Sequence, residues 1–128
     1  MKNIFLDKND WVEKVGYCRA KRVGNNIYIS GTVANDDEGN PVGLDNAGYQ
    51  TRVILERFEA IMDYFGYGLE AIVRTRIFTT DINRWEEIGN VHGEFFKDIK
   101  PTTTMVEVSR LIRDEYLVEI EAEAIIEI

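Results

Sequence analysis

The sequence contains one cysteine, one histidine and two prolines among its 128 residues. Because Cys18 has no second cysteine to pair with, an internal disulfide is excluded, which favours a reducing, cytoplasmic setting. One histidine without any Cys-x-x-Cys pair argues against a zinc centre, and we predict no metal. No apolar run approaches the roughly 20 residues of a membrane span, and the first residues lack the apolar stretch of a signal peptide. We therefore expect no membrane association.

Basic residues are also scarce, with 15 Lys and Arg against 23 Asp and Glu, for a formal net charge of −8. Because proteins that neutralise nucleic-acid phosphates need a basic face, we expect no nucleic-acid partner. The P-loop, the Gly-x-Gly-x-x-Gly motif and the Gly-x-Ser-x-Gly elbow are absent, which argues against a nucleotide site and a common class of hydrolase. The length and the 45% hydrophobic content predict one globular domain over residues 1–128.

Two β patterns lie near the end of the chain. Residues 100–108 read KPTTTMVEV, and residues 116–126 alternate between apolar side chains and glutamates. Pro101 suits the first residue of a strand. Because only residues 109–115 connect the two runs, we expect them to form neighbouring antiparallel strands. The polar face of this pair, where we expect any chemistry, would carry Thr103, Met105, Glu107, Glu119, Glu121 and Glu123.

Earlier strands are predicted over residues 17–23, 26–33 and 71–79, with a short one around 41–43. Gly24-Asn25 is a good two-residue hairpin turn between the first two. Gly31 lies within a strand pattern, where glycine indicates a bulge or a close approach to the backbone.

Helical periodicity appears twice between these strands. One helix is expected over residues 46–65, with Asp45 as its N-cap and Gly66 as the residue after its C-cap. A second begins after Asn83, which would be its N-cap, with Glu86 at the capping-box position.

The resulting element order is β, β, short β, α, β, α, β, β. It predicts an α+β fold with a single mixed sheet and two helices on one face. The uncovered face would then carry apolar side chains that favour self-association. We expect these side chains to be Tyr17, Tyr28, Thr103, Met105 and either Ile77 or Phe78.

Few side chains are candidates for chemistry. His92 has the spacing of the apolar helix stripe, so a packed, hydrogen-bonded histidine is favoured over a catalytic one. No Asp-rich loop accompanies Glu107, Glu119 and Glu121, which argues against a cation site. Arg74 and Arg76 point the same way from one strand, where they either bind a carboxylate or form ion pairs with the glutamates of the last strand.

The order of motifs resembles the Rid family of reactive intermediate deaminases, also called YjgF-like and once labelled endoribonuclease L-PSP. The likeness covers residues 15–126. It rests on Gly16-Tyr17, VGNNIYISGT, Gln50-Thr51, IVRTRIFTTDINRWEEIGNVHGEFF, Pro101, VEVSRL and VEIEAEA. The resemblance implies a chorismate-mutase-like fold and a homotrimer whose sheets close a central β-barrel, with sites in the clefts between subunits.

Family members with deaminase activity hydrolyse imines and enamines such as 2-aminoacrylate and 2-iminobutanoate to 2-oxo acids and ammonia, without a cofactor. The resemblance implies site roles for Tyr17, Ser30, Gly31 and Glu119. The family's arginine, two residues after the proline, binds the substrate carboxylate, and Thr103 stands in its place here. Losing that charged, bidentate contact costs about 1.5–3 kcal/mol. The chain therefore resembles branches of the family that lack the arginine.

Two main hypotheses follow. In the first, Glu119 activates water in a small-molecule hydrolase, Ser30 or the Gly31 N–H holds an oxygen, and Tyr17 forms a wall. The substrate carboxylate would then be bound by another arginine, and the candidate substrate-binding residues are Gly31, Thr103, Arg19, Arg74, Arg76 and Glu107. In the second, the trimer binds a metabolite or regulates a partner without catalysis. Ribonuclease activity, suggested only by the older label, is disfavoured by the charge and the lone histidine.

Overall fold

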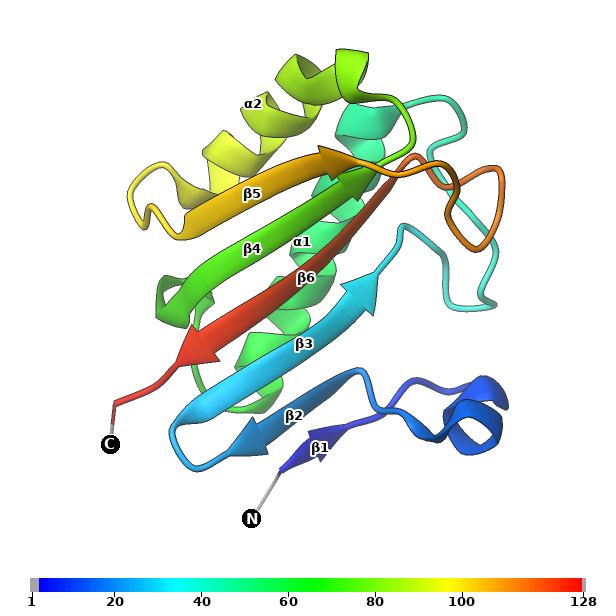
Figure 1. Cartoon of the computed structure of the whole chain (residues 1–128). Helices are drawn as coiled ribbons and strands as arrows, with labels where there is room; N and C mark the ends of the chain where they lie inside the picture. Colours follow the sequence, from blue (N-terminus) through cyan, green and yellow to red (C-terminus); the bar gives the residue numbers. More distant parts are fainter. Residues whose placement is uncertain (1–2, 128) are drawn as a thin grey trace.

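The computed structural model describes residues 3–127, which form one mixed sheet with two α-helices packed on one of its faces (Figure 1). The N-terminal half contains β1 (Ile4–Phe5), a short helical turn η1 (Val12–Gly16), β2 (Ala20–Val23), β3 (Asn26–Thr32) and α1 (Ala47–Tyr64). The C-terminal half contains η2 (Leu69–Ala71), β4 (Ile72–Thr79), η3 (Ile82–Arg84), α2 (Trp85–Phe96), β5 (Thr102–Glu107) and β6 (Val118–Ile125). Among residues 3–127, no helix is long and apolar enough to span a bilayer.

The strands lie in the order β1-β2-β3-β6-β4-β5. Among the strands of residues 3–127, only β4 and β5 pair in parallel, because α2 returns the chain to the same edge of the sheet. The prediction that β5 and β6 are neighbours is wrong, since β6 pairs with β3 and β4. The alternating pattern of β6 suits this central position, because every apolar residue on the side that faces the helices is buried. These residues are Val118, Ile120, Ala122 and Ala124.

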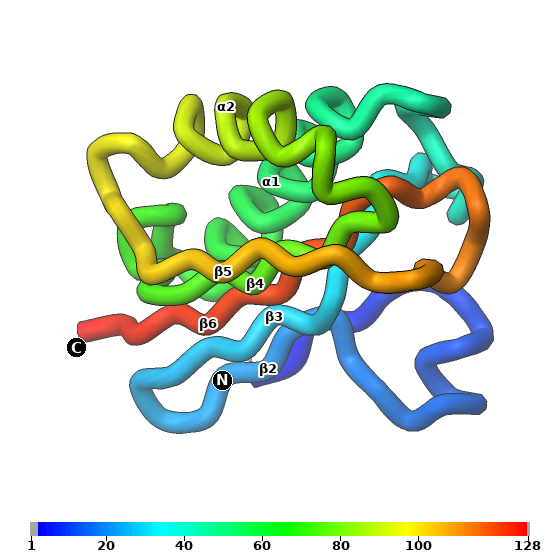
Figure 2. Tube along the Cα trace, turned by 45° about the horizontal axis from the view of Figure 1, so that its top comes forward, coloured from blue at the N-terminus to red at the C-terminus, as the bar shows by residue number. Residues whose placement is uncertain are grey.

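Both helices cover the same face of the sheet (Figure 2), as the sequence predicts. The apolar stripe of α1 is fully buried through Ile54, Leu55 and Phe58, and α2 contributes Ile88 and Phe96. This burial removes the apolar side of the sheet from water, which is the main stabilising term of such a layer.

The ends of α1 agree partly with the sequence. Gly66 has a φ of 88°, and the Tyr67 N–H donates to the Met62 carbonyl at 3.0 Å, so the predicted C-terminal glycine is confirmed. The N-cap is Asn46 rather than Asp45, because the Asn46 Oδ1 accepts from the Tyr49 N–H at 2.9 Å.

Two other local predictions are wrong. Asn83 is not the N-cap of α2, because α2 follows directly on η3 and has no side-chain cap at Arg84. The Asp81 carboxylate accepts from the Asn83 N–H at 3.0 Å and caps η3 instead. The short strand predicted around residues 41–43 is also absent from the described structure, which has an isolated bridge between Asn35 and Pro41 there.

The predicted turn at Gly24-Asn25 is confirmed. On either side of it, β2 pairs with β3 from Ala20 opposite Ile29 to Val23 opposite Asn26.

The register of β5 against β4 determines which side of the sheet each residue of β5 faces. Thr103 lies opposite Thr75 and Met105 opposite Ile77, and both partners are buried on the helix side. Thr103, Met105 and Glu107 therefore belong to the side of the helices, and the prediction that they share a face with the glutamates of β6 is wrong. Tyr28, which is 46% exposed, and Phe78 lie on the uncovered face as predicted, and Val106 lies there with them. Tyr17 lies outside the strands, directly after η1.

Candidate active site around Glu119

A bulge in β3 brings its backbone against Glu119. The pairing of β3 with β6 shifts register between Ile29 and Thr32, and a Cβ atom at Gly31 would lie 2.3 Å from the Glu119 Oε2. Only a residue without a side chain leaves room for the carboxylate there. The bulge and close approach predicted from Gly31 are confirmed, and the group that approaches is Glu119.

The Glu119 carboxyl is half-buried. Burial raises the pKa of Glu119 above its usual value, the neighbouring Arg19 guanidinium lowers it, and the carboxylate of Glu121 raises it further. Desolvation disfavours the charged form, so the carboxyl binds a proton more readily than an exposed glutamate. A group whose pKa approaches the working pH is suited to moving a proton.

Arg19 lies beside this carboxyl but is held from within the chain. It is only 7% exposed, and its Nε donates to the Asp7 Oδ2 at 2.9 Å. Its Nη1 donates to the Thr32 Oγ1 at 3.1 Å and also to the Gly31 carbonyl. These bonds lock the bulge in place, so Arg19 positions the backbone next to Glu119 rather than offering a free fork to a ligand.

A second arginine, Arg57, pairs with the Asp7 carboxylate that also binds Arg19. Arg57 Nη2 lies 3.4 Å from the Asp7 Oδ1, and its Nη1 donates to the Val33 carbonyl at 2.7 Å. Burial and the charge of Arg19 lower the pKa of Arg57. Sequence reasoning missed Asp7 and Arg57, because Arg57 lies on the polar side of the α1 pattern and Asp7 lies 50 residues away from it.

Tyr17 and Ser30 complete the group. The Tyr17 ring packs on the Arg19 guanidinium, with 5.6 Å between the ring centre and the central carbon. The Ser30 hydroxyl donates to the Cys18 carbonyl at 2.8 Å, so its proton is already engaged while its oxygen keeps a lone pair. The structure thus brings together Tyr17, Arg19, Ser30, Gly31 and Glu119.

Arg74 and Arg76 form ion pairs on the uncovered face. Arg76 Nη1 lies 3.0 Å from the Glu123 Oε1 and 3.3 Å from the Glu121 Oε1, and Arg74 Nε lies 4.0 Å from Glu123. Of the two alternatives left open by the sequence, the structure shows the ion pairs with the glutamates of β6.

Thr103 belongs to a different group on the helix side. Its Oγ1 lies 2.8 Å from the Thr75 Oγ1, which lies 2.9 Å from the His92 Nε2. His92 is therefore packed and hydrogen-bonded as predicted, and burial lowers its pKa. Glu107 accepts from the Ile82 N–H at 3.0 Å and holds the turn before α2. Within one chain, Thr103 and Glu107 are separated from the group around Glu119.

A metal centre finds no support among residues 3–127, where no three His, Cys, Asp or Glu side chains gather in a way that would hold an ion. The chemistry available at Glu119 is that of a partly desolvated carboxyl beside a backbone bulge.

Sequence and fold together define the class of protein. Residues 9–126 match the family model described as endoribonuclease L-PSP. The chain belongs to this family, which is the YjgF/RutC or Rid family that its motifs resemble. A RutC family protein of Pyrococcus horikoshii is 32% identical over 122 residues, with 95% of this chain and 96% of the relative covered.

Solved structures agree with this assignment. A YjgF-family protein of Mycobacterium tuberculosis superposes with a TM-score of 0.86 at 40% identity, covering 96% of this chain and 98% of the other. E. coli TdcF with bound serine has a TM-score of 0.78 at 28% identity, covering 87% and 88%. A protein named 3-aminoacrylate deaminase RutC, from Acinetobacter baylyi, is 28% identical over 123 residues, which is 96% of this chain and 97% of that protein.

Proposed function

We propose that this protein hydrolyses a small reactive imine or enamine to an oxo acid and ammonia, without a cofactor, with Glu119 as the catalytic residue. The observation that carries the proposal is the half-buried Glu119 carboxyl, with its raised pKa, fixed against the bulge at Gly31. The relative named 3-aminoacrylate deaminase supports a substrate of this class.

The proposed reaction moves its protons through the Glu119 carboxyl. Water adds to the carbon of the C=N bond and gives a proton to Glu119, which passes it to the nitrogen. Glu119 then carries the hydroxyl proton of this intermediate to the nitrogen as the C–N bond breaks, so ammonia leaves and the carbon becomes a carbonyl. An enamine first takes a proton on its β-carbon to become the imine. The bulged backbone around Gly31 holds an oxygen of the substrate or the intermediate. The Ser30 hydroxyl serves as an acceptor, because its own proton is donated to Cys18, and Tyr17 forms a wall.

The proposal includes a homotrimer whose sheets close a central barrel and whose sites lie between subunits. The uncovered sheet face supports it, since Tyr28, Val106 and Ile125 are 46%, 42% and 53% exposed there. Such a face favours burial against further copies of the chain. Sedimentation equilibrium tests this part: a trimer mass is expected, and a monomer at micromolar concentration would contradict it.

The decisive assay measures ammonia released from freshly generated 2-iminobutanoate. The wild type should accelerate release over the buffer, and Thr103→Arg should raise kcat/KM by roughly ten- to hundredfold if a restored guanidinium binds the substrate carboxylate. If the wild type is inactive and Thr103→Arg is active, the scaffold is deaminase-like but this protein is not a deaminase of that kind.

A second candidate is a trimer that binds a small metabolite without turning it over. Two observations favour it: Thr103 stands where the family's arginine is expected, and the solved TdcF holds serine. A thermal-shift screen of amino acids and 2-oxo acids distinguishes the two, because a ligand at one hundred times its Kd stabilises the fold by about 2.7 kcal/mol. Turnover of an imine together with no stabilising ligand would rule this candidate out.

A further inference from the structure

The N-terminal segment places a carboxylate beside the candidate active site. The Arg19 N–H donates to the Phe5 carbonyl at 2.8 Å, which aligns β1 with the start of β2. The Phe5 ring packs edge-on against the Tyr64 ring of α1, with 4.9 Å between the ring centres. Two residues after β1, the Asp7 side chain is only 17% exposed and binds the Arg19 guanidinium. The position of β1 therefore fixes where this carboxylate lies.

Arg19 and Glu119 both approach Gly31. A Cβ atom at Gly31 would meet the Glu119 carboxyl, and Arg19 Nη1 donates to the Gly31 carbonyl. Neighbouring groups of opposite charge favour an ion pair, most strongly where they are partly buried. Within residues 3–127, however, the Glu119 carboxyl forms no ion pair with Arg19 or with any other basic side chain.

The contacts of Arg19 explain this separation. Its Nε donates to the Asp7 Oδ2 at 2.9 Å. Its Nη1 is held by uncharged acceptors, the Thr32 Oγ1 at 3.1 Å and the Ser30 carbonyl at 3.3 Å. In the described part of the chain, Asp7 is the carboxylate that forms an ion pair with Arg19. Because a bound carboxylate offsets the charge of the guanidinium, a second carboxylate nearby is attracted less strongly.

The titratable and charged groups around Asp7 and Glu119 come from each element packed there: Tyr17, Arg19, Arg57, Tyr116 and Glu121. Burial raises the pKa of Glu119 most strongly, the Arg19 guanidinium lowers it, and the Glu121 carboxylate raises it. Arg19 is thus the cation that opposes a proton on Glu119. How readily Glu119 binds a proton depends on how much of the Arg19 charge is offset by Asp7.

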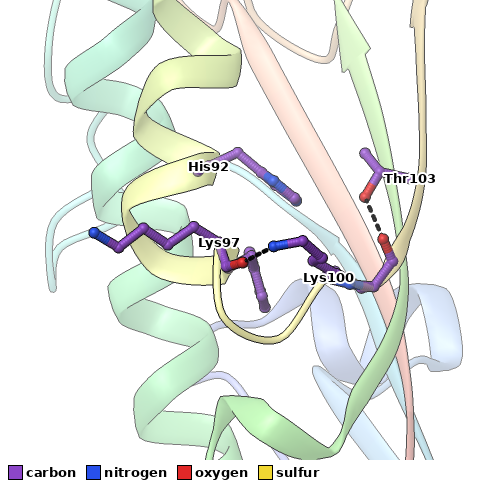
Figure 3. A pocket seen from close by; sticks show the side chains of 7 residues that line it. His92, Lys97, Lys100 and Thr103 are labelled. Atoms are coloured by element: carbon purple, nitrogen blue, oxygen red, sulfur yellow. Dashed lines mark hydrogen bonds between the residues drawn. The ribbon is translucent and has the colours of Figure 1, made fainter.

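The lysines at the end of α2 lie on the other side of the sheet. Together with His92, Lys97 and Lys100 border a hollow of about 270 Å³ on the helix side (Figure 3), whereas Glu119 alternates with the buried residues of β6. Lys100 has a left-handed backbone with a φ of 55°, and its ammonium donates to the Lys97 carbonyl. Within one chain, these groups therefore do not offset the charge of Glu119.

We propose that Asp7 is a positioning residue for the site at Glu119. By binding the Arg19 guanidinium, Asp7 keeps that cation from pairing with the Glu119 carboxyl, which stays free to accept and return a proton. This inference rests on the hydrolysis proposed at Glu119. It adds that a carboxylate from the N-terminal segment sets how the catalytic carboxyl works.

The test follows the proton on Glu119 directly. In protein labelled with ¹³C at the glutamate Cδ, each carboxyl gives an NMR signal that shifts as the group titrates. The Glu119 signal is the one missing from Glu119→Gln. In Asp7→Asn the proton affinity of Glu119 should fall by about tenfold or more, because the cation beside it has lost its carboxylate. The acid limb of the pH dependence of kcat/KM for 2-iminobutanoate should move to lower pH as well.

Three further variants separate charge from structure. Asp7→Glu keeps the carboxylate and should keep the wild-type titration of Glu119. Asp37→Asn removes the same charge from an exposed loop and should leave that titration unchanged. The double variant Asp7→Asn/Arg19→Gln removes the carboxylate and its cation together, so Glu119 should titrate close to the wild type.

Each outcome supports or overturns the proposal. Equal titration of Glu119 in wild type and Asp7→Asn overturns it, as does a fall in proton affinity that persists in the double variant. If Asp7→Asn does not fold, Arg19→Gln alone decides: losing the cation should raise the proton affinity of Glu119, and no rise overturns the proposal.

The titration needs no substrate, so the two proposals fail separately. A protein that shows these shifts but releases no ammonia contradicts the hydrolysis. A protein that turns over the imine with an unchanged titration in Asp7→Asn contradicts only the role of Asp7.

Discussion

Gly31 and Glu119 are in such close contact that a single added carbon would overlap the carboxylate. The nearest atom to a Cβ at residue 31 is the Glu119 Oε2 at 2.3 Å, and the next is the Glu119 Cδ at 3.0 Å. Because both atoms belong to the end of a side chain, the backbone can stay in place while the carboxyl moves. The position of Glu119 therefore depends directly on the glycine.

Gly31→Ala should consequently reduce catalysis more than stability. A displacement of about 1 Å at a reacting group costs about a hundredfold in rate, and we expect that loss in kcat/KM for imine hydrolysis. Gly89→Ala is the matched control, since nothing lies within 4 Å of its added carbon in the middle of α2. It should stabilise the protein by about 0.5–1 kcal/mol with unchanged activity. Equal activity in both variants would show that the contact at Gly31 has no catalytic role.

Asp7 should stabilise the fold by holding Arg19 and Arg57 together. Asp7→Asn keeps the shape but removes the charge, so two partly buried guanidinium groups lose the carboxylate that they share. We expect the free energy of unfolding to fall by about 1.5–3 kcal/mol, measured by urea denaturation at fixed protein concentration. Asp37→Asn, at an exposed loop position, should change it by less than about 0.5 kcal/mol. Equal effects of the two substitutions would contradict the shared ion pair.

Glu119 should make the protein less stable at higher pH. Since burial raises the pKa of Glu119 in the folded state, the native protein binds this proton more tightly than the unfolded chain does. The stabilisation is therefore present below the ordinary glutamate pKa and is lost as the pH rises through the folded value. Glu119→Gln removes this dependence, so its stability relative to wild type should increase between pH 4 and pH 8. If the stability of Glu119→Gln relative to wild type decreases over that range, the pKa of Glu119 is lowered in the folded protein and this account of its burial is wrong.

His92 should show the opposite dependence. Burial lowers the pKa of His92, so the unfolded chain binds the proton more readily. The corresponding stabilisation is present above the ordinary value of about 6.5 and is lost as the pH falls from there through the lower folded value. An NMR titration of this single histidine in a carboxylate-free buffer should give a pKa below 6.5. A value above 6.5 would mean that a negative group, absent from the described contacts, lies beside the ring.

Local patterns could predict most of the fold because each reports a neighbouring interaction. Alternation in β6, the turn Gly24-Asn25 and the glycine after α1 depend on residues close in sequence. The position of β6 between β3 and β4 depends on residues far apart in sequence. The short connection of residues 109–115 allows β6 to pair with β5 or to cross over to the far side of β4. The error in strand order then placed Thr103 on the wrong side, because side-chain direction follows register.

The candidate site was predicted to a similar extent. Gly31 in a strand pattern pointed correctly to a close approach, but which group approaches depends on the pairing of β3 with β6. Arg19 looked available to a ligand because a strand pattern does not reveal that Asp7 and the bulge carbonyls bind it. The left-handed backbone of Lys100 had no sequence signal, because a positive φ at a lysine becomes visible only in the folded chain.

The measurement that tests the central claim most directly compares ammonia release from 2-iminobutanoate by wild type and Glu119→Gln at equal, verified oligomeric state. Removing a general base lowers the rate by about 10²–10⁴-fold, while the amide preserves the shape against Gly31. We predict that the wild type releases ammonia well above the buffer rate and that Glu119→Gln loses at least about a hundredfold of this activity. Equal rates for the two proteins would contradict the assignment of Glu119 as the catalytic residue.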